Sequence, residues 1–210
     1  MFSKNRFDWP ENVAVELVSR YDDLGNANCT RTEIMTEDLR YPIGKFHAPA
    51  SISEADRAKL IDDIEAAPAL MRAAVAGLSP EQLRTPYRDG GWTVLQLVHH
   101  VPDSHMNAYV RFKLALTEDE PTIKPYEQAR WAELADSEKT PAETSLALLD
   151  SLHKRWVTLL RSLSPADWSR NFRHPELGVI ALDRNLALYA WHGKHHVAHI
   201  TSLRERKGWK

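Results

Sequence analysis

One pattern occurs twice in this chain, and this repeat is its strongest constraint on the fold. Each copy is a long stretch with apolar residues at close to a 3.6-residue period, then a Leu-Ser-Pro turn, then a second stretch with a histidine cluster. The two turns lie at residues 78–83 and 163–168. Two such helix pairs predict an all-α four-helix bundle with a pseudo-twofold relation, in which the second and fourth helices can face each other.

Apolar periodicity gives the approximate limits of the four helices. They are expected over residues 53–78, 92–116, 140–163 and 183–206. The connection between the second and third helices contains prolines and an aromatic-acidic segment, where a short helix is expected at residues 126–131.

Local signals predict how several of these helices begin and end. Thr140 and Glu143, with a proline at the first helical position, predict a capping box at the start of the third helix. Asp183 is expected to cap the fourth helix and Gly208 to end it. Pro102 lies inside the second helix and predicts a kink near its histidines.

The first 50 residues differ from the rest because they lack sustained periodicity and contain several prolines and glycines. We therefore expect an N-terminal arm or extension at residues 1–50 and one four-helix metal-binding domain at residues 51–210. Met35 precedes a more regular segment, which suggests the hypothesis that residues 1–34 are an upstream extension.

Composition excludes several classes of function. The formal net charge of −2 comes from 27 basic and 29 acidic residues spread along the chain, so no basic surface for nucleic acid is expected. No apolar run is long enough to span a bilayer, and the N-terminus does not resemble a secretory signal, so a soluble cytoplasmic protein is expected. Cys29 is the only cysteine, which restricts metal ligands to nitrogen and oxygen.

The histidines are unusually clustered, with three between positions 99 and 105 and four between 192 and 199. Histidines four residues apart on a helix project from one face and can bind one metal ion. Of the two such pairs on the fourth helix, His192 and His196 lie closer to the apolar stripe than His195 and His199 do. The inner pair is predicted to bind the metal, with His100 from the second helix as the third ligand.

The other polar residues of the second helix are placed in the same way, by their position around the helix relative to its apolar stripe. His105 lies near the centre of the apolar stripe, where a buried histidine bonded to a carbonyl is the more common outcome, and His99 lies opposite the stripe. Asp103 lies near the face of His100 and is the candidate proton acceptor for catalysis, although an exposed surface position explains it equally well.

Three neutral imidazoles suit Zn²⁺ or Ni²⁺ and leave a coordination position for water or substrate, as in catalytic sites. Gly193 and Lys194 follow His192, so the glutamate of the zinc protease signature His-Glu-x-x-His is missing. A serine or cysteine nucleophile is disfavoured, because the chain has no Gly-x-Ser-x-Gly elbow and Cys29 lies in the N-terminal arm.

Taken together, these motifs resemble the DinB-like superfamily, and within it the YfiT-like group of metal-dependent hydrolases, which is related to bacillithiol S-transferases. The resemblance extends from about residue 37 to the end of the chain. The matching segments are residues 39–46, 91–94, 99–100, 103–107, 111–113, 123–126, 153–156 and 189–200.

This resemblance implies a four-helix bundle that binds one Zn²⁺ or Ni²⁺ per subunit through His100, His192 and His196. It also implies a cytoplasmic homodimer. Pro102 departs from the family pattern, which has alanine there, and the segment before Met35 lies outside that pattern.

Three functions remain open on the sequence. A hydrolase would use metal-activated water, and a low-molecular-weight thiol S-transferase of the bacillithiol type would hold its thiol as a thiolate. The third is a non-enzymatic binding or stress-response protein whose metal stabilises the bundle. The expected partner is a small-molecule substrate, which for a transferase includes the thiol, with no nucleic acid and no membrane.

Overall fold

The computed structural model describes residues 38–210, and the expectations for residues 1–34, Cys29 and Met35 lie outside this range. Four long helices form most of the fold: α1 (Glu54–Val75), α3 (Val94–Thr117), α6 (Ala142–Arg161) and α7 (Leu182–Lys207). The shorter elements are α2 (Pro80–Leu83), α4 (Gln128–Trp131), α5 (Ala135–Lys139), the 3₁₀ helix η1 (Asp167–Ser169), β1 (Asn171–His174) and β2 (Gly178–Ala181). The predicted long helices and the short helix at residues 126–131 are confirmed to within a few residues.

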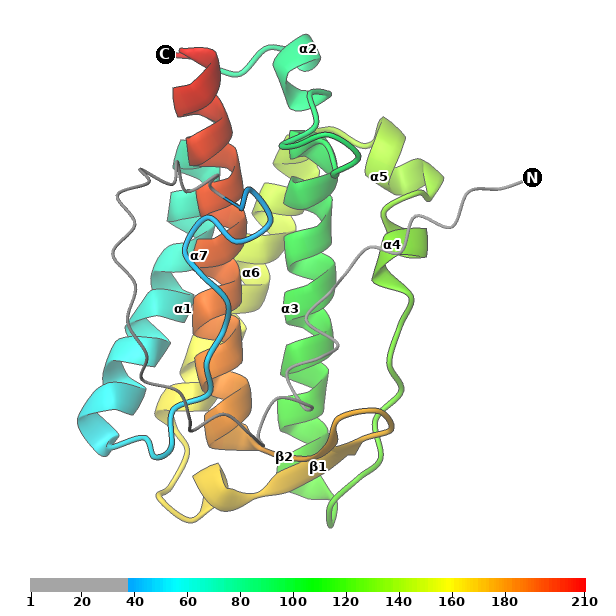
Figure 1. Ribbon diagram of the computed structural model, residues 1–210. Helices are drawn as coiled ribbons and strands as arrows, with labels where there is room; N and C mark the ends of the chain where they lie inside the picture. Colours follow the sequence, from blue (N-terminus) through cyan, green and yellow to red (C-terminus); the bar gives the residue numbers. More distant parts are fainter. Residues whose placement is uncertain (1–37) are drawn as a thin grey trace, which may run out of the picture.

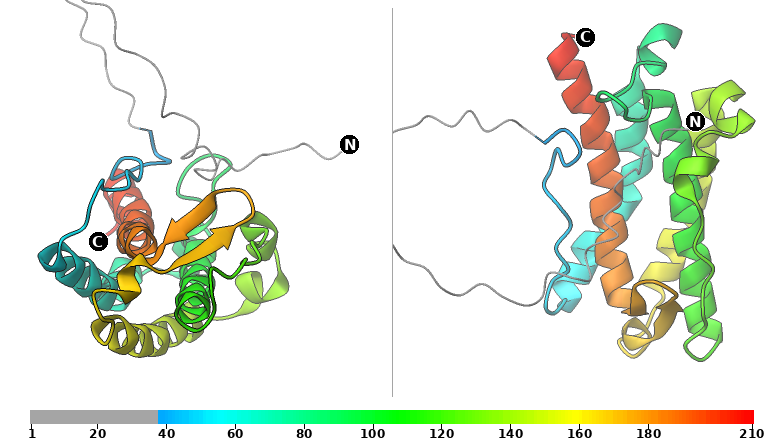
Figure 2. Two further views of the ribbon diagram at one scale, coloured as in Figure 1. Left: turned by 90° about the horizontal axis from the view of Figure 1, so that it is seen from below. Right: turned by 45° about the vertical axis from the view of Figure 1, so that its right-hand side comes forward.

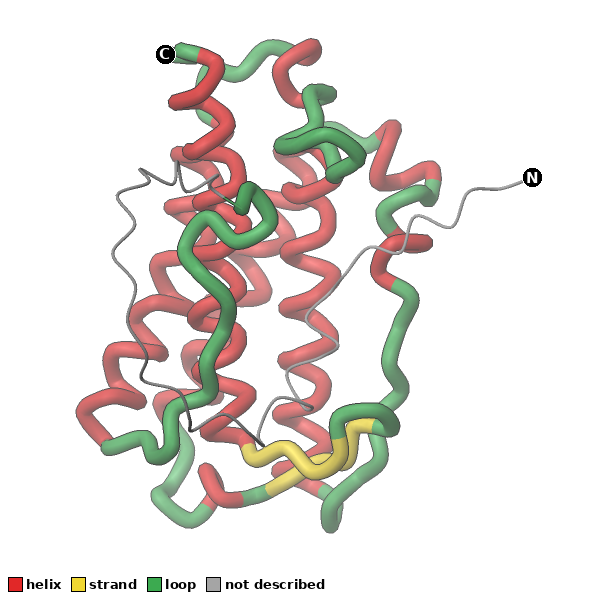
Figure 3. The backbone as a smooth tube through the Cα atoms, in the orientation of Figure 1, coloured by secondary structure: helices red, strands yellow, loops and turns green. Residues whose placement is uncertain are grey.

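The long helices form a four-helix bundle in which α1 packs against α6 and α7, and α3 packs against the same two helices. Figure 1 shows α1 and α7 running in one direction and α3 and α6 in the other. Figure 3 shows how α3 and α6 come to run in the same direction: the connection after α3 returns along the outside of the bundle before α6 begins. This topology makes α3 and α7 neighbours, as the sequence predicted.

The core of the bundle consists of two apolar layers separated by histidines. One layer lies near the hairpin and includes Ile64, Phe112, Trp156 and Leu186. The other layer lies toward the opposite end and includes Met71, Leu97, Leu149 and Ile200. Along α3, α6 and α7, respectively, the side chains of His105, His153 and His192 lie between these layers, and all three are buried. Buried imidazoles need hydrogen-bond partners, so this layer must be polar inside an otherwise apolar core.

Side-chain caps fix the starts of two long helices. At the start of α1, Ser53 and Asp56 form a capping box, and at the start of α3, Thr93 and Gln96 do the same. A third box at Ser79 begins α2, within the Leu-Ser-Pro turn that follows the first helix. Because each box satisfies backbone donors in the first turn, it sets the register of the residues that follow.

Two predicted caps are wrong. Thr140 does not cap the third helix, because it ends the unpredicted α5, and Pro141 holds the cap position of α6 without a side-chain bond. Ala181 precedes α7, so Asp183 lies inside the first turn, where its carboxylate accepts two bonds from Arg57 of α1 at 2.7 and 2.9 Å. Gly208 does end α7, with a φ of 64° that favours glycine.

A β-hairpin that the sequence did not predict covers one end of the bundle, as the view from below shows in Figure 2. β1 and β2 are antiparallel, and Phe172 pairs with Ile180. Both side chains are buried in the apolar layer near the hairpin. Strands of four residues are too short to give a clear alternating pattern, which explains why they were missed.

α3 runs unbroken through Pro102, and the kink predicted there stays a prediction. No helix among residues 38–210 is both long and apolar enough to span a membrane.

Candidate metal centre

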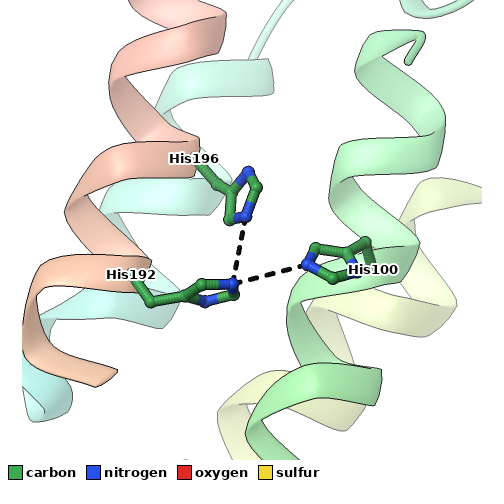
Figure 4. A group of neighbouring side chains, drawn as sticks. All are labelled: His100, His192 and His196. Carbon is green, nitrogen blue, oxygen red and sulfur yellow. Dashed lines mark hydrogen bonds between the residues drawn. The ribbon is translucent and has the colours of Figure 1, made fainter. Parts of the chain in front are cut away.

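Three histidine side chains from two neighbouring helices converge inside the bundle. Figure 4 shows His192 and His196 of α7 pointing toward His100 of α3. The Nε2 atom of His192 lies 3.4 Å from that of His100 and 3.1 Å from that of His196. All three side chains are buried, with 4% or less of each exposed. The structure therefore brings together the three residues predicted as ligands.

This arrangement fits a tetrahedral metal ion. With metal–nitrogen distances of about 2.0–2.1 Å, tetrahedral geometry places two ligand nitrogens about 3.3 Å apart. One ring nitrogen of each histidine lies within 4.8 Å of the others, and the separations of 3.4 and 3.1 Å from His192 Nε2 are close to that spacing. The donor set consists of imidazoles only, which suits zinc, nickel and related ions.

The three rings are uncharged at neutral pH, as metal binding requires. Burial lowers the pKa of His100 to about 3 and the pKa values of His192 and His196 well below the usual range. Neighbouring histidines add to the lowering, because two positive rings in contact repel each other. Each ring therefore has a nitrogen lone pair that a metal ion can bind without first displacing a proton.

Behind His192, a row of two further histidines leads to the backbone of α1. The Nδ1 atom of His192 lies 3.0 Å from Nε2 of His105, and Nδ1 of His105 lies 2.8 Å from Nε2 of His153. The Nδ1 atom of His153 lies 2.6 Å from the carbonyl oxygen of Ile64. The rings of His105 and His153 are stacked, with centroids 4.9 Å apart.

His105 is buried, as its place on the apolar stripe predicted, but it contacts two histidines rather than a carbonyl. His153 was not predicted as part of the site. Its position was a usable signal, because it lies four residues after Leu149 and three before Trp156, on the same apolar stripe of α6. A histidine in the middle of such a stripe needs a polar partner inside the core.

A second group of histidines lies on α7 beside the first. One ring nitrogen from each of His195, His196 and His199 lies within 4.8 Å of the others. Within residues 38–210, the buried Nδ1 atoms of these three rings have no hydrogen-bond partner. The group shares His196 with the first and comes from a single helix, so its ligands approach from one side only.

Electrostatics favours the first group as the metal site. Burial lowers the pKa of His199 to about 4, although the hydrogen bond to the carbonyl of Arg40 opposes the shift; the positive charges of Arg88 and Arg206 contribute to the lowering. The same charges oppose a divalent cation beside His199. We therefore assign the candidate centre to His100, His192 and His196.

His195 and His199 were predicted to lie farther from the apolar stripe of the helix than His192 and His196, yet both are buried. The segment before α1 covers them: His199 Nε2 donates to the carbonyl of Arg40 at 3.2 Å, and the ring of Tyr41 lies 6.2 Å from that of His195. Tyr87 packs on the ring of His199 with centroids 4.1 Å apart. A helical-wheel projection of α7 alone cannot show that these side chains are covered, because the covering residues come from other parts of the chain.

Two further residues of α3 were singled out in the sequence. His99 is also buried, and its ring nitrogens lie 2.7 Å from Ser145 Oγ and 3.1 Å from the carbonyl of Thr140. Burial, followed by the charge of Asp136, raises the pKa of Asp103 to about 6. Asp103 also contributes to the raised pKa of Tyr126, which is due first to burial. Its carboxyl group thus lies near the connection between α3 and α6, and its catalytic role stays a prediction.

Comparisons with known proteins agree with this description. Residues 63–200 match the family model of the DinB superfamily. A relative from Bacillus mycoides (strain KBAB4) is 59% identical over 173 residues, which are 82% of this chain and 99% of the relative. A relative from Oceanobacillus iheyensis is 54% identical over 170 residues, 81% of this chain and 98% of the relative. The names of both propose a metal-dependent hydrolase.

A solved structure also matches the fold. YfiT from Bacillus subtilis is 50% identical and superimposes with a TM-score of 0.80, covering 82% of this chain and 99% of its own. Its description proposes the same activity and reports a four-helix bundle of unusual topology. The arrangement of α1, α3, α6 and α7 is therefore shared with an experimentally determined structure.

Proposed function

Because the chain belongs to the DinB superfamily, we propose that it is a metal-dependent hydrolase whose ion is held by His100, His192 and His196. The observation that carries this proposal is the convergence of three buried, uncharged imidazoles at the spacing of a tetrahedral site. Three protein ligands leave a position for water or substrate, as in catalytic zinc sites and unlike closed structural sites.

The chain's own residues set the conditions for this chemistry. His100 comes from α3 and the other two ligands from α7, so the packing of two helices fixes the distance between donors. The ring of Trp92 lies 4.7 Å from that of His100 and limits its movement. When bound, a divalent ion at these nitrogens supplies a Lewis acid and lowers the pKa of water at the site toward neutrality.

Hydrolysis is favoured over thiol transfer because the names of the relatives propose it. The proposed ion is Zn²⁺ or Ni²⁺, which a donor set of imidazoles suits. The substrate is expected to be a small molecule with an ester, amide or lactone bond, since metal-activated water attacks such carbonyl groups.

Metal analysis of the full-length protein tests the site. We expect about one equivalent of zinc or nickel per chain. The ion should be lost in the His192→Ala, His196→Ala double variant and retained in His47→Ala, which removes an exposed histidine. Unchanged metal content in the double variant would rule out this centre.

Activity assays test the reaction. The metal-loaded protein is expected to hydrolyse at least one class in a panel of esters, amides and lactones, whereas the double variant is not. The hydrolase proposal is overturned if the loaded protein hydrolyses none of them but conjugates a low-molecular-weight thiol to an electrophile, which would identify a transferase. Metal binding without either activity would identify a metal-stabilised binding protein.

A further inference from the structure

We propose that His105, His153 and the carbonyl of Ile64 form a relay that holds His192 in the tautomer able to bind the metal ion. This inference rests on the metal site of the proposed function and assigns positioning roles to residues that do not touch the ion. The relay runs from His192 on α7 through His105 on α3 and His153 on α6 to α1, so each long helix contributes one member.

The relay ends at a backbone carbonyl that a proline has left available. In an α-helix, the carbonyl of each residue accepts a bond from the N–H four residues later. Pro68 follows Ile64 by four residues within α1, and proline has no N–H. The carbonyl of Ile64 thus lacks its usual helical donor, and His153 Nδ1 approaches it at 2.6 Å.

This carbonyl determines where each proton lies. A carbonyl oxygen only accepts, so Nδ1 of His153 must carry the hydrogen. Burial lowers the pKa of His153 to about 4, so the ring is neutral at pH 7 and its Nε2 carries only a lone pair. That Nε2 can only accept, so the hydrogen between His153 and His105 belongs to His105 Nδ1.

The same step repeats at the next ring. His105 is fully buried, and burial away from water disfavours the charged form of its ring. With a hydrogen on Nδ1, His105 has a lone pair on Nε2, and this lone pair accepts from Nδ1 of His192 at 3.0 Å. His192 is then left with an unprotonated Nε2, the atom that faces His100 and His196.

The consequence is a preorganised ligand. A histidine that donates its second N–H to a fixed acceptor has one tautomer and one ring orientation, and its ligating nitrogen becomes more basic. Removing such a partner typically weakens metal binding by about 10–100-fold. A row of histidines that merely satisfied core polar groups would affect the stability of the bundle without this effect on metal affinity.

Zinc affinity, measured by competition with a chelator, distinguishes the two roles. His105→Phe removes the acceptor of His192 and should weaken zinc binding by about 10–100-fold. His105→Gln offers a carbonyl oxygen as a replacement acceptor and should restore part of the affinity. His153→Phe leaves the contact between His105 and His192 but frees the tautomer of His105, so a smaller loss is expected.

His99→Phe is the matched control. His99 is a buried, hydrogen-bonded histidine of the same helix, and its partners Ser145 and Thr140 lie outside the relay. This variant should lose stability but keep its zinc affinity. The relay is overturned if His105→Phe binds zinc as tightly as His99→Phe does.

The tautomers can be read directly from ¹⁵N NMR of the metal-free protein at neutral pH. His192, His105 and His153 are each expected to carry hydrogen on Nδ1 and none on Nε2. A hydrogen on Nε2 of His192 would refute the relay. This experiment needs no metal, so the failure of wild-type protein to bind zinc would overturn the proposed function and still leave the relay open to test.

Discussion

His99 and His100 are adjacent in the sequence, yet their rings meet different partners. His99 bonds to groups near the start of α6, whereas His100 faces His192 of α7. A helix turns by about 100° per residue, so neighbouring side chains enter different parts of a bundle. At the scale of the residue, the role of each histidine is therefore set by the partner that each ring nitrogen meets.

His153 gives a prediction on pH at this scale. Its pKa is about 4 in the folded protein, because of burial, against 6.5 for an ordinary histidine. As the pH falls below about 6.5, the unfolded chain takes up a proton that the folded chain does not, so the free energy of unfolding falls. The difference in pKa corresponds to about 3 kcal/mol, present above pH 6.5 and lost by about pH 4.

Urea denaturation of metal-free protein at pH 7.5, 6 and 5 measures this effect. The wild type should lose more stability between pH 7.5 and 5 than His153→Phe does, since the variant has no titrating group at that position. Parallel pH profiles for the two proteins would contradict the assignment.

At the scale of the element, α1 and α7 pack closely together at a glycine in the metal-binding segment. A Cβ atom added at Gly193 would lie 3.2 Å from Cβ of Ala67 and 3.7 Å from Cε1 of His105. The first distance is tighter than ordinary van der Waals contact, so larger side chains would push α1 away. The glycine follows His192 directly, which links this contact to the position of a proposed ligand.

Gly193→Val should therefore destabilise the protein by about 1–3 kcal/mol through overpacking. Helix propensity alone predicts the opposite sign, because glycine is among the least favourable helical residues. Arg184→Val introduces the same residue at an exposed position of α7 and reports the cost of valine in this helix. Equal unfolding free energies for the two variants would show that the helices can separate freely at Gly193.

At the scale of the whole molecule, the metal site joins α3 to α7 inside the bundle. An ion that binds only the folded state stabilises it by mass action. At a free zinc concentration of 100 times the dissociation constant, this amounts to about 2.7 kcal/mol. For a domain of this size, the melting temperature should rise by about 5–10 °C.

Thermal unfolding with zinc and after chelation measures this stabilisation. The His192→Ala, His196→Ala double variant serves as the control and should melt at the same temperature in both conditions. A similar rise in the double variant would place the zinc elsewhere on the protein. The homodimer and the cytoplasmic location expected from the family stay predictions.

Much of the architecture follows from the sequence alone. The helices are predictable because apolar residues that recur every 3.6 residues fall on one face of a helix, where they can be buried together. The same periodicity selects His192 and His196 over the other pair on α7, and the repeat of two helix pairs predicts that His100 faces them. Caps were less reliable: Thr140 and Asp183 have suitable side chains, but Thr140 ends α5 and Asp183 binds Arg57.

Only the tertiary structure shows the cover over His195 and His199 and the relay through His105 and His153. His153 and Ile64 are 89 residues apart, and His199 and Arg40 are 159 apart. Local periodicity indicates that a side chain points inward, but it does not say which group from another helix will meet it. Helix packing decides this, because a buried ring nitrogen takes its tautomer and its role from its partner.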